Sequence, residues 1–139
     1  ALAHAANHLV TILGQSQQVL ASIGIEDPAR YMGPLVRAAV DNALASGEGA
    51  LTGPVARGDA GTVKAHLQAL NEYSEHEKTG DITDSYAALA HATAKRAHNR
   101  GLLNDEQLGR IEDLLGESSD RNHPGDIDDS APENKEFSS

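Results

Sequence analysis

The chain has 139 residues, which is enough for one domain, and it contains no cysteine, so neither a disulfide framework nor a cysteine-based metal site is possible. Its formal net charge of −10 argues against nucleic acid or an anionic membrane as a partner, because both require a basic face. With no Trp, one Phe and three Tyr, the core must come from Leu, Ile, Val and Ala, which suits closely packed helices.

Residues 1–25 contain no Asp, Glu, Lys or Arg. Such a long, Ala- and Leu-rich stretch would suit a membrane span. However, its apolar and its uncharged polar side chains recur on separate faces at helical spacing, and a lipid-facing helix would not carry a full stripe of amides and imidazoles. A surface helix would carry Lys and Glu instead. We therefore predict a long central helix with one face in the core and the other along a cleft or a subunit interface, with neither a membrane span nor a signal peptide.

Glycine and proline divide the next part of the chain. Gly24 is placed to end the first helix in a left-handed conformation. Asp27 followed by Pro28 is typical of a helix N-cap with proline in the first turn. Gly33 and Pro34 interrupt the apolar pattern that follows, so we expect a short helical piece and then a longer one.

The segment 51–59, with the sequence LTGPVARGD, contains too much glycine and proline for a regular helix. Asp59 at its end can cap the helix that follows. Two further helices are expected after that one. The last of them opens with the capping sequence NDEQ at 104–107, and Gly116 is expected to end it.

No strand pattern occurs along the chain, so the sequence predicts an all-α fold, a multi-helix bundle around the long N-terminal helix. Residues 117–139 are rich in Ser, Asp, Glu, Asn, Pro and Gly and cannot bury enough apolar surface to offset the entropy of ordering them. We therefore divide the chain into a helical domain at 1–116 and a disordered acidic tail at 117–139. An acidic tail that binds a basic partner is the alternative interpretation.

Two segments together resemble a known bacterial family. They are Ala5-Ala6-Asn7-His8-Leu9-Val10 in the first helix, and the segment 51–59 with Thr62-Val63 and His66-Leu67 after it. The pairing resembles the C-terminal helical domain, of unknown function, of bacterial proteins that begin with a Rossmann-like domain. That domain is similar to the helical halves of 6-phosphogluconate dehydrogenase-like proteins, with ketopantoate reductase and pyrroline-5-carboxylate reductase as more distant relatives. The resemblance covers roughly residues 1–115, and its Thr-Gly-Pro-x-x-Arg-Gly-Asp segment is the more specific part.

The resemblance implies a dimerisation and substrate-binding domain of a cytoplasmic NAD(P)-dependent oxidoreductase. A Rossmann domain on the N-terminal side would bind NAD or NADP, and a cleft between the two domains would hold a small polar or anionic substrate. The helical domain would pair with its twin as a homodimer. This chain has no strand–GxGxxG–helix unit, so we expect it to bind no cofactor alone and the Rossmann domain to be supplied upstream.

The first helix supplies two candidate catalytic residues. Relatives place an Asn that hydrogen-bonds the substrate at the position of Asn7, and many carry a proton-donating Lys one turn earlier, where this chain has Ala3. His4 is therefore the candidate proton donor, since imidazole titrates near neutrality. Alternatively, Asn7 and His4 only satisfy backbone or interface partners.

The loop before the third predicted helix supplies the candidate substrate-binding residues, which are Thr52, Gly53, Pro54, Arg57 and Asp59. Backbone N–H groups in such a loop can hold an anionic group, and Arg57 can clamp a carboxylate with two hydrogen bonds. The alternative is a helix-entry loop in which Arg57 pairs with Asp59 or with an acid across an interface.

Two other functions stay open at this stage. One is a structural dimerisation or interaction module without catalysis. The other is a metal-binding bundle, because His4 and His8 have the i, i+4 spacing of a metal pair. A metal needs a third ligand from another helix, and the sequence does not identify one, so no metal site is predicted.

Overall fold

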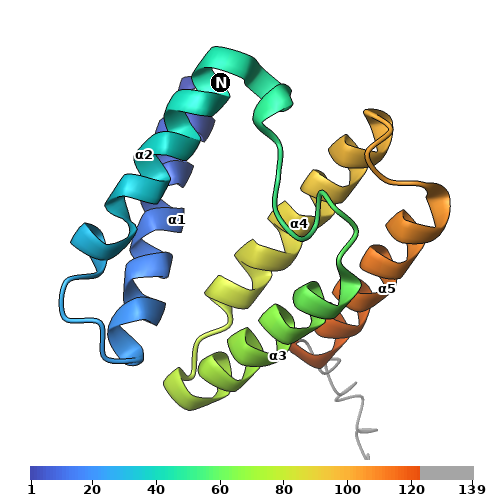
Figure 1. Ribbon diagram of the computed structural model, residues 1–139. Coiled ribbons are helices and arrows are strands. Elements are labelled where there is room, and N and C mark those ends of the chain that lie inside the picture. Colours follow the sequence, from blue (N-terminus) through green and yellow to red (C-terminus); the bar gives the residue numbers. More distant parts are fainter. Residues whose placement is uncertain (123–139) are drawn as a thin grey trace, which may run out of the picture.

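The computed structural model describes residues 1–122, and within this range it contains five α-helices, a short 3-10 helix and no strand (Figure 1). The helices are α1 (Leu2–Ser22), α2 (Pro28–Ser46), α3 (Ala60–Glu77), α4 (Asp81–Asn99) and α5 (Asp105–Asn122), and the 3-10 helix η1 (Gly47–Ala50) follows α2 directly. The predicted all-α, multi-helix fold is therefore confirmed.

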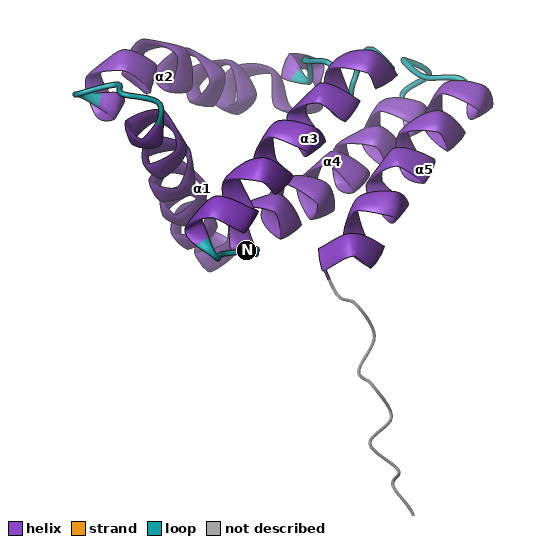
Figure 2. Cartoon of the chain, turned by 90° about the horizontal axis from the view of Figure 1, so that it is seen from below, coloured by secondary structure: helices purple, strands orange, loops and turns teal. Residues whose placement is uncertain are grey.

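The helices form two groups. α1 and α2 pair as a hairpin, whereas α3, α4 and α5 pack against one another as a three-helix bundle (Figure 1). Figure 2 shows the hairpin to one side of the bundle. Polar contacts join the two groups: Arg96 of α4 pairs with Glu48 of η1, and Gln15 of α1 hydrogen-bonds to Asp81 at the start of α4.

The apolar core lies in the three-helix bundle. Val63 of α3, Ala94 and Ala97 of α4 and Ile111 of α5 are each 0 % exposed. Alanine on successive turns of α4 leaves room for α5 to approach closely, so the branched Ile111 fills the space between the helices. The core is thus built from the small and aliphatic side chains that the composition predicts.

The position of α1 differs from the prediction of a central helix. The helix has the predicted length, but none of its residues is buried, and Leu2 and Val10 are 87 % and 70 % exposed. The reason is that α3, α4 and α5 enclose the core among themselves, so α1 packs on α2 at the side. None of the helices in residues 1–122 combines the length and the apolar content that crossing a membrane requires.

Helix starts follow the predicted capping chemistry. The carboxylate of Asp27 accepts a hydrogen bond from the backbone N–H three residues later at 3.0 Å, and Asp59 does the same at the start of α3, also at 3.0 Å. Asn104 and Gln107 exchange backbone-to-side-chain hydrogen bonds of 3.0 and 2.8 Å, which is a capping box at the start of α5. Local sequence therefore determines where these helices begin.

Two predicted helix breaks are wrong. α2 continues through Pro34, whose missing N–H removes only one backbone hydrogen bond, and Met32 and Val36 on either side of the proline line the same cavity. α5 continues through Gly116 and takes in residues 117–122, which were assigned to the tail. Leu115, which is buried, anchors the helix beside this glycine. The predicted disorder at 123–139 lies outside the described residues.

We expect the Gly116→Ala substitution to raise the free energy of unfolding by about 0.5–1 kcal/mol, because alanine favours a helix interior over glycine by about that amount. A Cβ at this position would meet no other atom within 4 Å. Urea denaturation followed by circular dichroism measures the change. A loss of stability would contradict a helix that runs through this residue, since alanine is disfavoured at a left-handed helix end.

Candidate functional site

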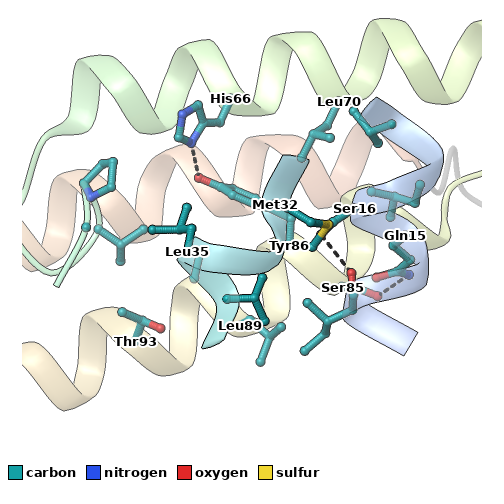
Figure 3. Close-up of a pocket in the computed structure, with 18 of the residues that line it drawn as sticks. Gln15, Ser16, Met32, Leu35, His66, Leu70, Ser85, Tyr86, Leu89 and Thr93 are labelled. Carbon is teal, nitrogen blue, oxygen red and sulfur yellow. Dashed lines mark hydrogen bonds between the residues drawn. The ribbon is translucent and has the colours of Figure 1, made fainter. Parts of the chain in front are cut away.

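A cavity of about 860 Å³ separates the α1–α2 hairpin from the three-helix bundle. α1, α2, α3 and α4 all contribute to its wall, together with the loop at 52–55 that leads into α3. Most of the lining is aliphatic, and no Asp, Glu, Lys or Arg lines it. Figure 3 shows Met32 and Leu35 of α2 opposite Leu89 of α4 and Leu70 of α3.

Gln15 connects α1 to α4 at one part of the cavity wall. Its side-chain N–H group donates to the Asp81 carboxylate at 2.8 Å and to the Ser85 hydroxyl at 3.0 Å. A hydrogen bond from the Thr79 hydroxyl, followed in importance by the one from Gln15, lowers the pKa of Asp81 below its usual value. Gln15 is therefore already committed to protein partners and holds the hairpin against the bundle.

His66 of α3 and Tyr86 of α4 form a second polar pair in the wall. The His66 Nδ1 atom and the Tyr86 hydroxyl lie 3.0 Å apart, and Figure 3 shows the two groups facing each other. The rings meet edge to face, with centroids 5.8 Å apart. Partial burial raises the pKa of the Tyr86 hydroxyl above its usual value, so the phenol is neutral at physiological pH.

Sequence reasoning did not identify His66 and Tyr86 as site residues. Tyr86 fits an ordinary apolar position of its helix, and His66 entered only as part of the family resemblance. The two lie 20 positions apart, on successive helices, and only the packing of α3 on α4 brings them together. A helical pattern places each residue on a face of its own helix but does not give the rotation of one helix against the next.

The predicted substrate-binding loop divides between the cavity and the surface. Thr52, Gly53 and Pro54 line the cavity, whereas Arg57 is exposed and does not line it. The loop folds into tight turns, in which the Arg57 backbone N–H donates to the Gly53 carbonyl at 3.1 Å and the Asp59 N–H donates to the Pro54 carbonyl at 2.9 Å. The structure thus brings three of the five predicted loop residues to the cavity.

Asp59 caps α3 and does not line the cavity. Its carboxylate accepts hydrogen bonds from the backbone N–H of Thr62 at 3.0 Å and from the Thr62 hydroxyl at 2.7 Å. These two hydrogen bonds lower the pKa of Asp59 below its usual value, and the one from the Thr62 hydroxyl has the larger effect. Its observed role is to start α3 at the residue that the sequence predicts.

We expect Asp59→Asn to lower the melting temperature at neutral pH, because the charged form makes the stronger cap. Folding lowers the pKa of the Asp59 carboxyl, so its charged form stabilises the folded chain at any pH above the unfolded-state pKa. This stabilisation is lost as the pH falls through the folded-state pKa. The melting temperatures of the variant and the unmodified chain should therefore converge as the pH falls well below the usual aspartate pKa. A difference that stays constant from neutral to strongly acidic pH would contradict this role.

The two predicted catalytic residues lie near the N-terminal end of α1. The Nδ1 atoms of His4 and His8 are 2.8 Å apart, so one ring donates to the other. Both line a smaller cavity of about 390 Å³, which shares Ile12, Ser85 and Leu89 with the large one. Asn7 is exposed, lines neither cavity, and accepts a hydrogen bond from the Thr11 hydroxyl on its backbone carbonyl.

The histidine pair does not form part of a larger set of metal ligands in the structure. Among residues 1–122, no group of three or more His, Cys, Asp or Glu side chains is placed to hold a metal ion. His4 and His8 therefore make an aromatic and hydrogen-bonded contact within one helix, with ring centroids 4.8 Å apart.

One known family model matches the part of the chain that forms the cavity. Residues 1–93 match the model of a domain of unknown function, DUF2520. The chain belongs to the DUF2520 family. Every residue that lines the large cavity falls within the matched part of this DUF2520 domain, and Thr93 is the last of them in the sequence. No curated protein and no solved structure matched the chain.

The DUF2520 match does not extend to α5, although α5 completes the core of the bundle. The matched part consists of the hairpin, the punctuated loop, α3 and most of α4, which are the elements that surround the cavity. The family match therefore covers all of the residues that line the cavity but not the whole bundle.

Proposed function

We propose that this DUF2520 domain is the dimerisation and substrate-binding half of a cytoplasmic NAD(P)-dependent oxidoreductase, related to the C-terminal domains of 6-phosphogluconate dehydrogenase-like proteins. The observation that carries the proposal is the cavity between hairpin and bundle, which lies entirely within the family match. A large, mostly apolar cavity with a few polar groups is the usual form of a small-molecule site. The resemblance at Asn7 and in the loop 51–59 supports the same assignment.

The residues of this chain do not fit a dinucleotide site. Residues 1–122 contain no strand, and the sequence contains no strand–GxGxxG–helix unit to hold the phosphates. We therefore assign NAD or NADP to a Rossmann domain outside this chain. The part proposed for the helical domain is to bind the substrate, hold it in one orientation and exclude water from it.

Three side chains of the helical domain have proposed roles in binding the substrate and in its reaction. Asn7 would hydrogen-bond a small polar or anionic substrate, His4 would donate a proton, and Arg57 would bind an anionic group. Arg57 and Asn7 are exposed and therefore open to a ligand from outside the domain. Ala3, in place of the Lys that many relatives carry, makes His4 the only imidazole or amine among the first seven residues.

The proposed homodimer rests on the exposed apolar side chains of the hairpin. The exposed apolar side chains, each 68 % or more exposed, are Leu2 and Val10 of α1, Ile23 just after α1, and Tyr31, Leu35 and Leu44 of α2. α1 carries no charged side chain at all. Removing such surface from water contributes about 25 cal/mol per Å², so a second copy that covers the hairpin would be stabilised by these residues.

The test of the oxidoreductase proposal uses the full-length protein that carries this domain. NADH or NADPH should bind it with a dissociation constant in the micromolar range, about 1 μM to 1 mM, as measured by nucleotide fluorescence. Asn7→Ala and Arg57→Ala should each lower turnover with an added substrate and leave cofactor binding unchanged. Absence of cofactor binding to a protein with an intact glycine-rich loop would overturn the proposal.

A non-catalytic dimerisation module is the second candidate. The observation in its favour is that Ala3 stands where many relatives have a proton-donating Lys, and that Asn7 and Arg57 do not line the cavity. For such a module, Asn7→Ala and Arg57→Ala would change no biochemical measurement, while self-association would persist in both variants.

A further inference from the structure

The large cavity has a lining that selects against charge. No Asp, Glu, Lys or Arg lines it, so a charged group placed against its apolar wall would lose water without gaining a charged partner. The lining therefore favours an uncharged group in the cavity and leaves any anionic part of a ligand outside it. The part of the ligand that enters must be uncharged and must present mainly carbon to side chains such as Val19, Met32, Leu70 and Leu89.

The cavity also contains a polar group with unused hydrogen-bonding capacity. A tyrosine hydroxyl has one donor hydrogen and two acceptor lone pairs, and Tyr86 uses one of these three in its contact with His66. The amide N–H group of Gln15, by contrast, already donates to Asp81 and Ser85. Among the hydroxyls of the cavity wall, which include those of Thr52, Ser85 and Thr93, the Tyr86 hydroxyl is the one held by a histidine ring, so it can recognise one oxygen atom of a ligand in a fixed position.

The partner of Tyr86 allows that recognition to work in two directions. When His66 Nδ1 carries a hydrogen it donates to the Tyr86 oxygen, and the tyrosine O–H is free to donate to a ligand carbonyl. When His66 Nδ1 is unprotonated it accepts from Tyr86, and the tyrosine oxygen is free to accept from a ligand hydroxyl. The pair can thus bind either the carbonyl or the hydroxyl form of one compound.

From these observations we propose that the cavity binds an uncharged, mostly hydrocarbon group with one carbonyl or hydroxyl oxygen, and that the oxygen hydrogen-bonds to Tyr86. The proposal rests on the proposed oxidoreductase function and adds to its substrate an uncharged part held in the cavity, while the polar or anionic part that Asn7, His4 and Arg57 would bind lies outside it. The cavity volume of about 860 Å³ suits a ligand of drug-like size.

The chain offers a single-residue probe for this cavity. Met32 lines the cavity and is the one methionine of the sequence, so labelling methionine methyl groups with carbon-13 gives one protein signal that reports on the site. The ligands are 4-phenyl-2-butanone and n-butylbenzene, which have the same skeleton and differ only by a carbonyl in place of a methylene group. Both are titrated into the unmodified chain, into Tyr86→Phe and into the control Tyr73→Phe, which alters a tyrosine of α3 outside the cavity.

Both compounds should shift the Met32 signal in the unmodified chain. Tyr86→Phe should weaken binding of the ketone by about fivefold to tenfold, the effect of one hydrogen bond, and change the hydrocarbon affinity by less than twofold. Tyr73→Phe should change neither. Circular dichroism checks that each variant is folded. In the unmodified chain, the Tyr86 ring carbon that bears the hydroxyl gives a second carbon-13 signal. The ketone should shift this signal and the hydrocarbon should not.

Three results would overturn the proposal. The first is a Met32 signal that neither compound moves. The second is a Tyr86→Phe variant that binds the ketone as well as the unmodified chain does. The third is a Tyr86 ring-carbon signal that the hydrocarbon shifts as much as the ketone does. None of these measurements uses a nicotinamide cofactor, so their failure is distinguishable from a failure of the oxidoreductase proposal.

Discussion

Replacing Leu103 by alanine is expected to lower the free energy of unfolding by about 3 kcal/mol, within the range of 2–5 kcal/mol for buried leucines. Leu103 lies in the loop between α4 and α5, is 3 % exposed, and belongs to the core cluster of the bundle. Its removal would leave a cavity among residues of α3, α4 and α5 that are already closely packed.

The neighbouring residue provides a matched control for this experiment. Leu102 has the same side chain in the same loop but is 48 % exposed, so Leu102→Ala should cost less than about 1 kcal/mol. Urea denaturation of the two variants under identical conditions gives both values. Equal losses would contradict the placement of Leu103 in the core and Leu102 at the surface.

Replacing Gly58 by alanine is expected to lower the free energy of unfolding by about 2–4 kcal/mol, because two costs add. The backbone of Gly58 is left-handed, with φ of 69°, which disfavours any residue with a Cβ. The new Cβ would also lie 2.9 Å from the Gln107 side-chain amide and 3.1 Å from a Leu103 methyl group. The substitution would therefore push the loop that leads into α3 away from α5.

Gly101 separates the two costs. It has nearly the same backbone conformation, with φ of 72°, but a Cβ there would meet nothing within 4 Å. Gly101→Ala should therefore cost only about 1–2 kcal/mol of backbone strain. The excess of Gly58→Ala over Gly101→Ala measures the close packing of the loop on α5, and an excess of zero would contradict that packing.

Local features of the sequence were sufficient to predict where the helices begin. The caps at Asp59 and at Asn104 depend on hydrogen bonds between residues three positions apart, so the local residue types determine them. The predicted breaks at Pro34 and Gly116 were wrong because one unfavourable residue costs a helix only a few kcal/mol or less, and the residues on both sides of each remain helical.

The site was predictable only in part. The glycine- and proline-rich loop was identified from its composition, and Thr52, Gly53 and Pro54 do line the cavity. The pairing of His66 with Tyr86 depends on the packing of one helix on another, which periodicity does not specify. The prediction for α1 was correct in placing one face along a cleft, since Ile12, Gln15 and Val19 line the cavity, and wrong in placing the other face in the core, because the core closes among α3, α4 and α5.

The proposed dimer depends on the exposed apolar side chains of the hairpin, among them Leu2 and Val10 of α1, and sedimentation velocity tests it most directly. We expect the unmodified chain to sediment with twice the chain mass. Val10→Glu places a carboxylate at an exposed apolar position of α1, so it should raise the dimer dissociation constant by about 100-fold or more. Gln68→Glu, an equal change of charge on the exposed side of α3, should leave the dimer intact. An unmodified chain that stays monomeric up to about 100 μM would contradict the proposed role of α1.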